Sequence, residues 1–131
     1  MNHSSYQNLI AWKRARRLVR VIYALTDTFP LHERFVLTPQ MRRAVHSVTS
    51  NLAEGHGRLS NAEWQQFLGY ARGSLMELES DGIVAYDLDY ASREALTPIM
   101  AHIREVLKLV NGLLRASMKG FETRKFKPVS R

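Results

Sequence analysis

The chain of 131 residues contains no cysteine, only four prolines and seven glycines, and no long run of apolar residues. The absence of cysteine excludes disulfide bonds and metal sites with thiolate ligands, and it agrees with a reducing compartment. No apolar stretch approaches the roughly 20 residues that a helix needs to cross a bilayer. The N-terminus lacks the basic and then apolar order of a secretory signal. We therefore expect a cytoplasmic protein that has no membrane partner.

The residues that are present indicate one compact domain. Hydrophobic residues make up 45% of the chain, a share typical of folded rather than disordered proteins. A chain of this length is large enough to bury one core but not two. We therefore predict a single domain over residues 1–131.

Positive charge predominates, and it is unevenly distributed along a chain whose net charge is +7. Residues 1–58 carry nine Lys and Arg against three Asp and Glu, residues 59–91 carry one against six, and residues 92–131 carry nine against three. An acidic segment thus lies between two basic ones. Two interpretations follow: the charges complement one another within the fold or between subunits, or the basic segments form an outer surface for nucleic acid.

Apolar residues recur at steps of three and four along four segments, which predicts four amphipathic helices. We place these helices at about 8–29, 38–55, 60–87 and 93–119, followed by a basic tail over 120–131. No segment shows the alternation typical of a strand, and the connections are short. The predicted fold is all-α, an antiparallel up-down-up-down four-helix bundle.

Capping residues indicate where the second and fourth helices begin. Thr38 and Pro39 suit the N-cap and the first position of the second helix. The start of the fourth helix has two solutions. Ser92 as the N-cap would leave Pro98 inside the helix, whereas Thr97 as the N-cap would put Pro98 at the first helical position.

The start of the third helix carries a stronger signal. Ser60 and Glu63 have the spacing of a capping box, and Leu59 and Trp64 occupy the positions of a hydrophobic staple. These four residues predict a helix that begins directly after a tight corner.

Two glycines, Gly69 and Gly73, lie one turn apart inside the third predicted helix. Glycine in a helix interior is less stable than alanine by about 0.5–1 kcal/mol. The pair therefore suggests the close approach of another helix, either the second helix or one from a neighbouring subunit.

Cationic residues lie on one face of the first predicted helix, at positions 13, 16, 17 and 20. Like charges at this spacing weaken a helix by tenths of a kcal/mol per pair unless an anion offsets them. A solvated face is the simpler interpretation, and a surface for phosphates is the alternative. With the cations of the second helix and the tail, the candidate nucleic-acid-binding residues are Lys13, Arg16, Arg17, Arg20, Arg42, Arg43, Arg124, Lys125 and Lys127.

Polar residues form a second stripe on the second helix at steps of four and three. We expect polar residues of the third helix to meet it. Buried charges need partners, so the stripe predicts a core network or a subunit interface, with Arg43 paired to Glu54 or Glu77, and a ligand contact as the alternative. The members of this candidate network are Arg43, Ser47, Asn51, Glu54, Ser74 and Glu77.

Known catalytic and metal-binding patterns are absent from the sequence. Carboxylate-bridged di-iron bundles need Glu-x-x-His pairs, and none of His46, His56 and His102 completes one. There is no Gly-x-Ser-x-Gly elbow, no cysteine nucleophile and no phosphate-binding loop. We expect no enzyme, no catalytic residue, no metal and no cofactor.

A short signature in the second predicted helix resembles a known family. Residues 42–47 read Arg-Arg-Ala-Val-His-Ser and residues 50–55 read Ser-Asn-Leu-Ala-Glu-Gly. They are similar to the Arg-Arg-x-x-x-Ser-x-x-x-Asn-(Ile/Leu)-Ala-Glu-Gly pattern of a bacterial four-helix-bundle family encoded in intervening sequences of 23S ribosomal RNA genes. Thr49 departs from the pattern, because the family usually has proline there.

The resemblance extends over roughly residues 8 to 120. It includes Leu-Ile-Ala-Trp-Lys at 9–13, Phe-Pro at 29–30 and Ala-Arg-Gly-Ser-Leu-Met-Glu-Leu-Glu at 71–79. After this last segment the pair Ser80-Asp81 replaces the Thr-Gln that is usual in the family.

The resemblance implies a function that the composition does not. Relatives, which include accessory proteins of diversity-generating retroelements, are four-helix bundles that assemble into ring-shaped pentamers with basic surfaces. By resemblance we expect a homopentamer that binds the backbone of RNA or DNA without catalysis, with a reverse transcriptase as a partner by analogy only. The alternative is a protein-interaction scaffold or structural ring that binds no nucleic acid.

Overall fold

The computed structural model describes residues 5–126, with side chains through Lys119, and this part of the chain is helical without any strand. Four long helices follow one another: α1 (Ile10–Thr26), α2 (Leu37–His56), α3 (Asn61–Asp87) and α4 (Arg93–Phe126). Two short 3-10 turns, η1 (Tyr6–Asn8) and η2 (Leu31–Glu33), precede α1 and α2. The all-α prediction with four helices is confirmed.

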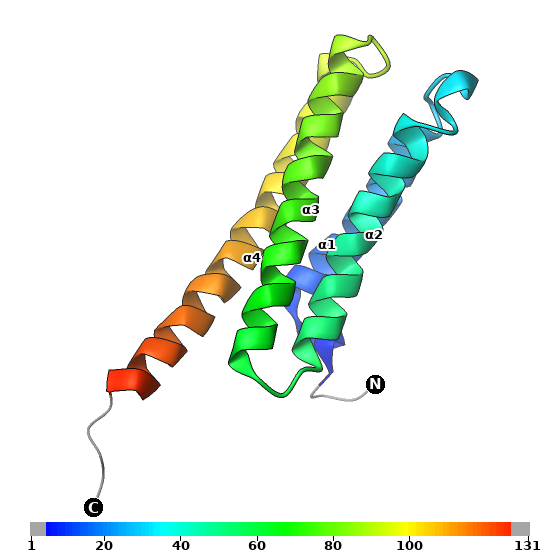
Figure 1. Ribbon diagram of the computed structural model, residues 1–131. Coiled ribbons are helices and arrows are strands. Elements are labelled where there is room, and N and C mark those ends of the chain that lie inside the picture. Colours follow the sequence, from blue (N-terminus) through cyan, green and yellow to red (C-terminus); the bar gives the residue numbers. More distant parts are fainter. Residues whose placement is uncertain (1–4, 127–131) are drawn as a thin grey trace, which may run out of the picture.

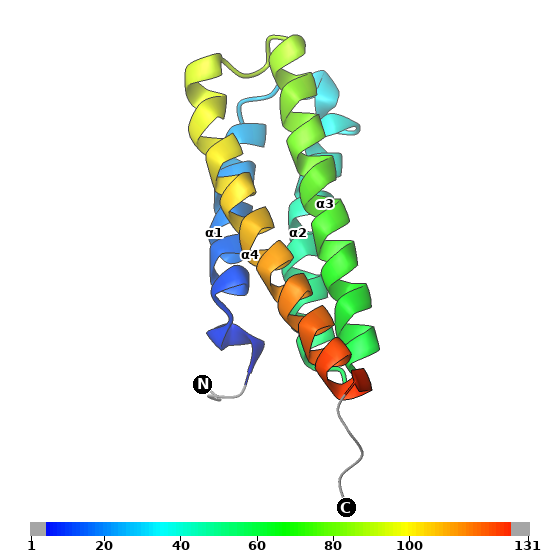
Figure 2. The ribbon, with the colours of Figure 1, turned by 90° about the vertical axis from the view of Figure 1, so that its left-hand side faces the viewer.

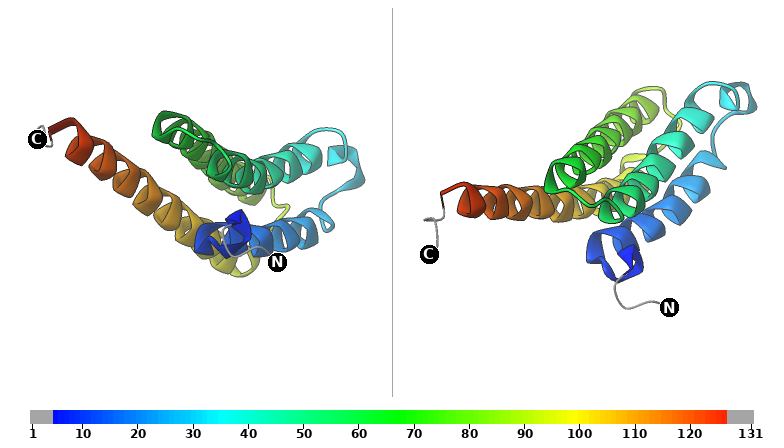
Figure 3. Two further views of the ribbon diagram at one scale, coloured as in Figure 1. Left: turned by 90° about the horizontal axis from the view of Figure 1, so that it is seen from below. Right: turned by 60° about the horizontal axis from the view of Figure 1, so that its bottom comes forward.

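The connections lie at opposite ends of the molecule. Figure 1 shows the α1–α2 and α3–α4 connections at one end, and the tight α2–α3 corner at the other. Figures 2 and 3 show that α4 starts beside α1 and moves away from it toward its C-terminal end. There it crosses the start of α3, where the side-chain amide of Asn61 donates to the carbonyl of Ser117 at 2.8 Å.

One apolar core joins the four helices. Each fully buried side chain of this size stabilises the fold by about 1.5–3 kcal/mol relative to exposure, and the burial follows the predicted helical stripes. The largest fully buried side chains are Leu18, Ile22, Met41, Val45, Val48, Leu52, Leu68, Leu75, Leu78, Ile103, Val106 and Val110.

Helix α1 is shorter than the predicted span of 8–29. The chain before it forms η1, in which the Ser5 side chain accepts a hydrogen bond from the backbone N–H of Gln7. At the other end Thr26 and Thr28 donate their hydroxyls to preceding carbonyls. Such local side-chain bonds compete with continued helix, and α1 ends at Thr26.

The predicted N-cap of α2 is wrong. The helix begins at Leu37, one residue before Thr38, and its N-terminal backbone N–H donates to the Glu33 carboxylate at 3.3 Å instead. Pro39 is consequently the third residue of the helix. Its missing N–H still falls among the first four, which have no partner within the helix.

The corner before α3 confirms one prediction and contradicts another. The Ser60 hydroxyl accepts from the backbone N–H of Glu63 at 3.1 Å, as an N-cap should. Leu59, however, is fully exposed and makes no hydrophobic staple. Trp64 turns the other way and packs edge-on against His56, with ring centroids 6.0 Å apart.

Helix α4 begins after Ser92, whose hydroxyl accepts from the backbone N–H of Ala95 at 3.1 Å. Pro98 therefore lies inside the helix, and the alternative start at Thr97 is excluded. The helix continues through Phe126, beyond the predicted end at 119. Part of the predicted tail over 120–131 is thus helical backbone.

The glycines show where helices do and do not come close. A Cβ added at Gly55 would lie 2.5 Å from the Cβ of Phe67 and 2.9 Å from a ring carbon of Trp64, so only glycine fits between α2 and α3 there. At Gly69 and Gly73 a Cβ would meet nothing within 4 Å. The expectation that α2 approaches this glycine pair is wrong, and the option of a neighbouring subunit stays open.

We predict that Gly55→Ala lowers the free energy of unfolding by about 1–3 kcal/mol, because the methyl group overpacks the α2–α3 contact. The matched control is Gly112→Ala in α4, where a Cβ would meet only the end of the Arg115 side chain at 3.9 Å. This change should raise the free energy of unfolding by about 0.5–1 kcal/mol. Urea denaturation followed by circular dichroism measures both, and equal effects of the two substitutions would contradict the prediction.

Candidate nucleic-acid interface

Four cationic side chains share the outward side of α1, and we call them the basic face: Lys13, Arg16, Arg17 and Arg20. All four are exposed. Among the side chains that the structure describes, none of the four forms an ion pair. With a rise of about 1.5 Å per residue, they span about 10 Å along the helix axis. The basic face is thus a compact and uncompensated positive charge.

The opposite side of α1 explains why these side chains point outward. Ala11, Ala15, Leu18 and Ile22 are all buried in the core. Because these apolar positions recur at steps of four, three and four, burying them leaves the cations on the solvent side. The core of the protein therefore holds the basic face in place.

Arg14 is the cation of α1 that lies outside the basic face. Its Nε is 3.0 Å from a carboxylate oxygen of Glu105 on α4, and both side chains are partly exposed. This ion pair joins α1 to α4. Exposed pairs contribute little stability, about 0–1 kcal/mol, but the contact removes Arg14 from the cations available to a ligand.

A shallow groove of about 590 Å³ follows the basic face. Besides the four cations it is lined by Gln7, Trp12, Val21 and His102. Neither Trp12 nor Gln7 is among the binding residues predicted from the sequence. The signal that could have identified Trp12 is its spacing from Arg16, because residues four apart on a helix are neighbours.

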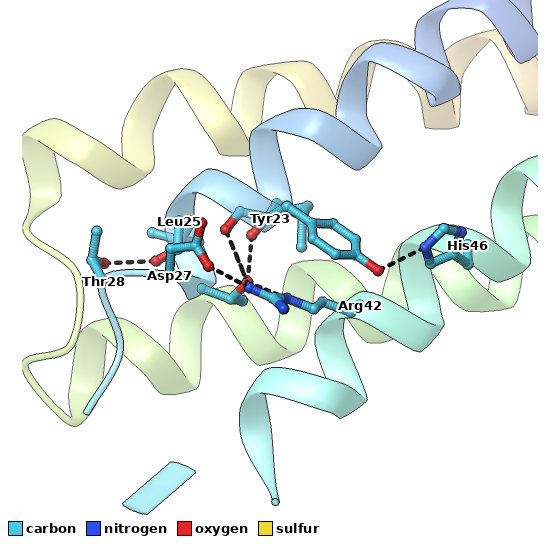
Figure 4. A network of polar contacts seen from close by, with 8 residues as sticks. Tyr23, Leu25, Asp27, Thr28, Arg42 and His46 are labelled. Atoms are coloured by element: carbon cyan, nitrogen blue, oxygen red, sulfur yellow. Dashed lines mark hydrogen bonds and ion pairs between the residues drawn. The ribbon is translucent and has the colours of Figure 1, made fainter. Parts of the chain in front are cut away.

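Arg42 does not belong to the basic face but clamps α2 to the end of α1 (Figure 4). Its Nε donates to the Thr26 hydroxyl at 2.9 Å, and a terminal nitrogen lies 2.8 Å from the Asp27 carboxylate. The same nitrogen donates to the carbonyl of Tyr23 at 3.5 Å, and the guanidinium carbon lies 4.3 Å from the centre of the Tyr23 ring. The Tyr23 hydroxyl continues the network to His46 at 2.8 Å. All of these contacts are internal.

The remaining predicted cations lie on other helices or outside the described residues. Arg43 is exposed on α2. Arg124 and Lys125 belong to the last turns of α4, whose side chains are outside the described set, and Lys127 is outside the described residues altogether. Among the predicted cations whose side chains the structure describes, only Lys13, Arg16, Arg17 and Arg20 are brought together.

Part of the predicted polar network does form, between α2 and α3. The Asn51 side-chain amide donates to the carbonyl and the hydroxyl of Ser47 at 2.8 and 2.9 Å. The Ser74 hydroxyl of α3 donates to the Ser47 hydroxyl at 2.8 Å. These three residues are half-buried, so they tie the two helices together without offering a free site.

The charged members of the predicted network do not join it among the described side chains. Glu54 pairs at 2.7 Å with Arg58, which follows four residues later, just past the end of α2. Arg43 and Glu77 are exposed, and neither forms the predicted pair among the described residues. The hydrogen bonds thus join the uncharged members Ser47, Asn51 and Ser74, whereas Glu54 pairs outside the predicted set.

Asp81 is the buried carboxylate of the same α2–α3 interface, 7% exposed. The Gln40 side chain donates to its Oδ1 at 2.9 Å, whereas the buried Oδ2 has no hydrogen-bond partner. Burial raises the pKa of Asp81, the hydrogen bond from Gln40 lowers it less, and the nearby charge of Glu77 raises it further. Asp81 belongs to the pair that departs from the family pattern.

The described side chains contain no group of three or more His, Asp and Glu residues that could hold a metal ion. Within the same part of the chain, no helix is long and apolar enough to span a membrane.

The protein is thus a small all-α protein in which four helices surround one core, and its helix α1 carries a basic face that is unpaired among the described side chains. The chain belongs to the 23S rRNA-intervening sequence protein family, which it matches over residues 7–112. The predicted family is thereby confirmed.

A solved structure shows the same fold. It is a protein of unknown function from the S23 ribosomal protein family of Bacteroides thetaiotaomicron VPI-5482, with a TM-score of 0.75 and 21% sequence identity. The match covers 80% of this chain and 98% of that one. At this identity the similarity establishes the fold alone. No protein with a curated description matches the chain.

We predict that Asp81→Asn raises the free energy of unfolding at pH 7. The pKa of Asp81 in the folded protein is raised above the ordinary 3.8. The contribution of Asp81 to the free energy of unfolding is therefore fully present below pH 3.8 and is lost as the pH rises through the folded pKa. The variant should therefore lose less stability between pH 4 and pH 7 than the wild type does.

The matched control for this prediction is Asp87→Asn, an exposed aspartate on the same helix. Urea denaturation at the two pH values should give the control the same pH dependence as the wild type. A lower stability of Asp81→Asn at pH 7 would show that the hydrogen bond from Gln40 outweighs the effect of burial, contrary to the direction assigned to the pKa of Asp81.

Proposed function

We propose that the chain is a non-catalytic, homo-oligomeric, up-down-up-down four-helix bundle of the cytoplasm that binds the phosphate backbone of RNA or DNA through the basic face of α1. The observation that carries this proposal is the absence of any carboxylate partner for four exposed cations on one helix face, within the described side chains. The same chain uses Arg14, Arg42, Arg58 and Arg104 in internal ion pairs.

Phosphate is the anion that such a surface suits best. Cations that neutralise phosphates release condensed counterions, so affinity depends steeply on salt and little on sequence. Positions 13, 17 and 20 are about 6 and 4.5 Å apart along the helix axis, close enough for neighbouring phosphates of one strand. Among the described helices no helix-turn-helix arrangement accompanies them, so the contacts would position a nucleic acid rather than read base edges.

The outward side of α3 supports a homo-oligomer. Met76, Ile83 and Val84 are each more than 40% exposed, and Gly69 and Gly73 leave open space on the same helix. A helix with apolar residues on both sides is usually buried on both. A ring of five subunits is the assembly that the family resemblance implies.

The second candidate function is a protein-interaction scaffold without nucleic acid, and the same α3 surface favours it. In that case the acidic α3 of one subunit would take up the basic face of the next. The two functions differ in whether Lys13, Arg16, Arg17 and Arg20 stay free in the oligomer.

We predict that replacing Arg16, Arg17 and Arg20 together by Gln weakens binding of labelled RNA and duplex DNA. For four phosphate contacts, the logarithm of affinity should fall with the logarithm of salt with a slope of about −3.6 on duplex, and each lost contact should reduce the slope by about 0.9. Fluorescence anisotropy at several salt concentrations measures affinity and slope together.

The matched control removes the same charge elsewhere, by replacing Arg58, Arg72 and Arg104 with Gln. Each of these already has a partner, in Glu54, Asn111 and Glu79. The control should keep the wild-type slope. If an intact oligomer binds neither RNA nor DNA at about 50 mM salt, the nucleic-acid proposal fails and the scaffold takes its place.

We predict further that Met76→Glu combined with Ile83→Glu dissociates the oligomer, because charges on an apolar contact surface must be desolvated without a partner. Light scattering should show a lower mass, while circular dichroism keeps the same helix content. Leu59→Glu is the control, since Leu59 is fully exposed at the α2–α3 corner and its change should leave the mass unaltered. An unchanged mass of the double variant would exclude this side of α3 as the contact.

A further inference from the structure

At one end of the basic face, Arg16 lies against the aromatic ring of Trp12. The guanidinium carbon of Arg16 lies 5.6 Å from the ring centre of Trp12, and Tyr6 meets the same ring edge-on at 5.1 Å and 69°. Trp12 also packs against the hydrophobic core. The indole is therefore held from two sides, and it holds the Arg16 guanidinium in turn.

Arg16 still has a free side. The residue is exposed, and among the described side chains it has no carboxylate partner. A guanidinium is planar, and its plane stacks on nucleobases as aromatic rings do. Trp12 and Arg16 together thus form a preorganised platform for a second planar group.

The surroundings of this platform fit a nucleotide rather than an isolated aromatic group. Lys13 precedes Arg16 by three residues and Arg20 follows it by four, so each lies within about 6 Å of it along the helix axis. A base on Arg16 would therefore have its two flanking phosphates beside cations. The groove of about 590 Å³ falls within the range of about 300–1,000 Å³ typical of small-ligand sites.

Gln7 adds a polar group at the same groove. Its amide oxygen is buried and has no hydrogen-bond partner. A turn of the side chain would present this unused acceptor to an amino group of a base, in keeping with the rule that buried polar atoms find partners.

We propose that the Trp12–Arg16 platform binds an unpaired nucleobase, so that the protein prefers single-stranded nucleic acid to duplex. This inference rests on the proposed function, because Lys13, Arg17 and Arg20 must hold the adjoining phosphates. In a duplex each base is covered by its neighbours and cannot reach the platform. Single-strand binding proteins combine the same two elements, a basic track and a stacking surface.

The test compares three ligands of equal length and phosphate number: a single-stranded oligonucleotide, the same strand with abasic sugars, and a duplex. Anisotropy at about 50 mM salt should show the base-containing strand bound about tenfold more tightly than the abasic strand, the expected effect of one stacked base. In a Trp64→Phe background Trp12 is the only tryptophan, and its fluorescence should change with the base-containing strand alone.

Two conservative variants separate stacking from charge. Arg16→Lys keeps the cation but loses the plane, so it should abolish the tenfold preference for the base-containing strand over the abasic strand. Arg17→Lys is the matched control and should keep the preference, because no aromatic ring lies under Arg17 among the described contacts.

The outcomes distinguish this inference from the proposed function. Equal binding of the base-containing and abasic strands would overturn the stacking platform and leave backbone binding intact. A preference that survives Arg16→Lys would also overturn it. Failure of all three ligands to bind would overturn both proposals.

Discussion

The close contact of α2 with α3 is the constraint on which the rest of the structure depends. Gly55 lets the backbone of α2 approach Phe67 and Trp64 directly after the corner. Farther along the same interface, Ser74 bonds Ser47 at 2.8 Å and Gln40 bonds Asp81 at 2.9 Å. The steric fit at Gly55 sets the distance between α2 and α3 at one end. Hydrogen bonds between side chains join the two helices farther along their length. The pair forms one wall of the core.

Helices α1 and α4 pack on this wall through the apolar core, and cations add contacts between the helices. Arg42 ties α2 to the last turn of α1 through Thr26 and Asp27, and Arg14 reaches Glu105 on α4. Each such contact removes one positive charge from the exposed surface. What is left on α1 is the basic face, so the arrangement that completes the fold also determines which cations can meet a phosphate.

The acidic segment of α3 does not compensate the basic face within the chain. Glu79 pairs with Arg104 at 3.3 Å, Asp81 is bonded by Gln40, and Glu63 lies 3.7 Å from Arg58. Among the described side chains, the ion pairs of the acidic α3 residues are accordingly made with α4 and with the α2–α3 corner. The positive charge of α1 is left for an external anion or for another subunit.

Features that arise within a few residues could be read from the sequence alone. The four amphipathic helices, the Ser60 cap and the clustering at positions 13, 16, 17 and 20 follow from periodicity and local spacing, and the signature of residues 42–55 indicated the family.

Features that join distant residues could not be predicted in this way. That Arg42 is internal, Leu59 exposed and Arg14 paired with Glu105 depends on how the helices rotate and meet. The sequence by itself determined the helices and the charges that they carry. Only the tertiary structure decided which charges stay free and which ring lies under Arg16. The sequence offers each cation several carboxylates or rings as partners, and the packing of the helices decides which of them comes within reach.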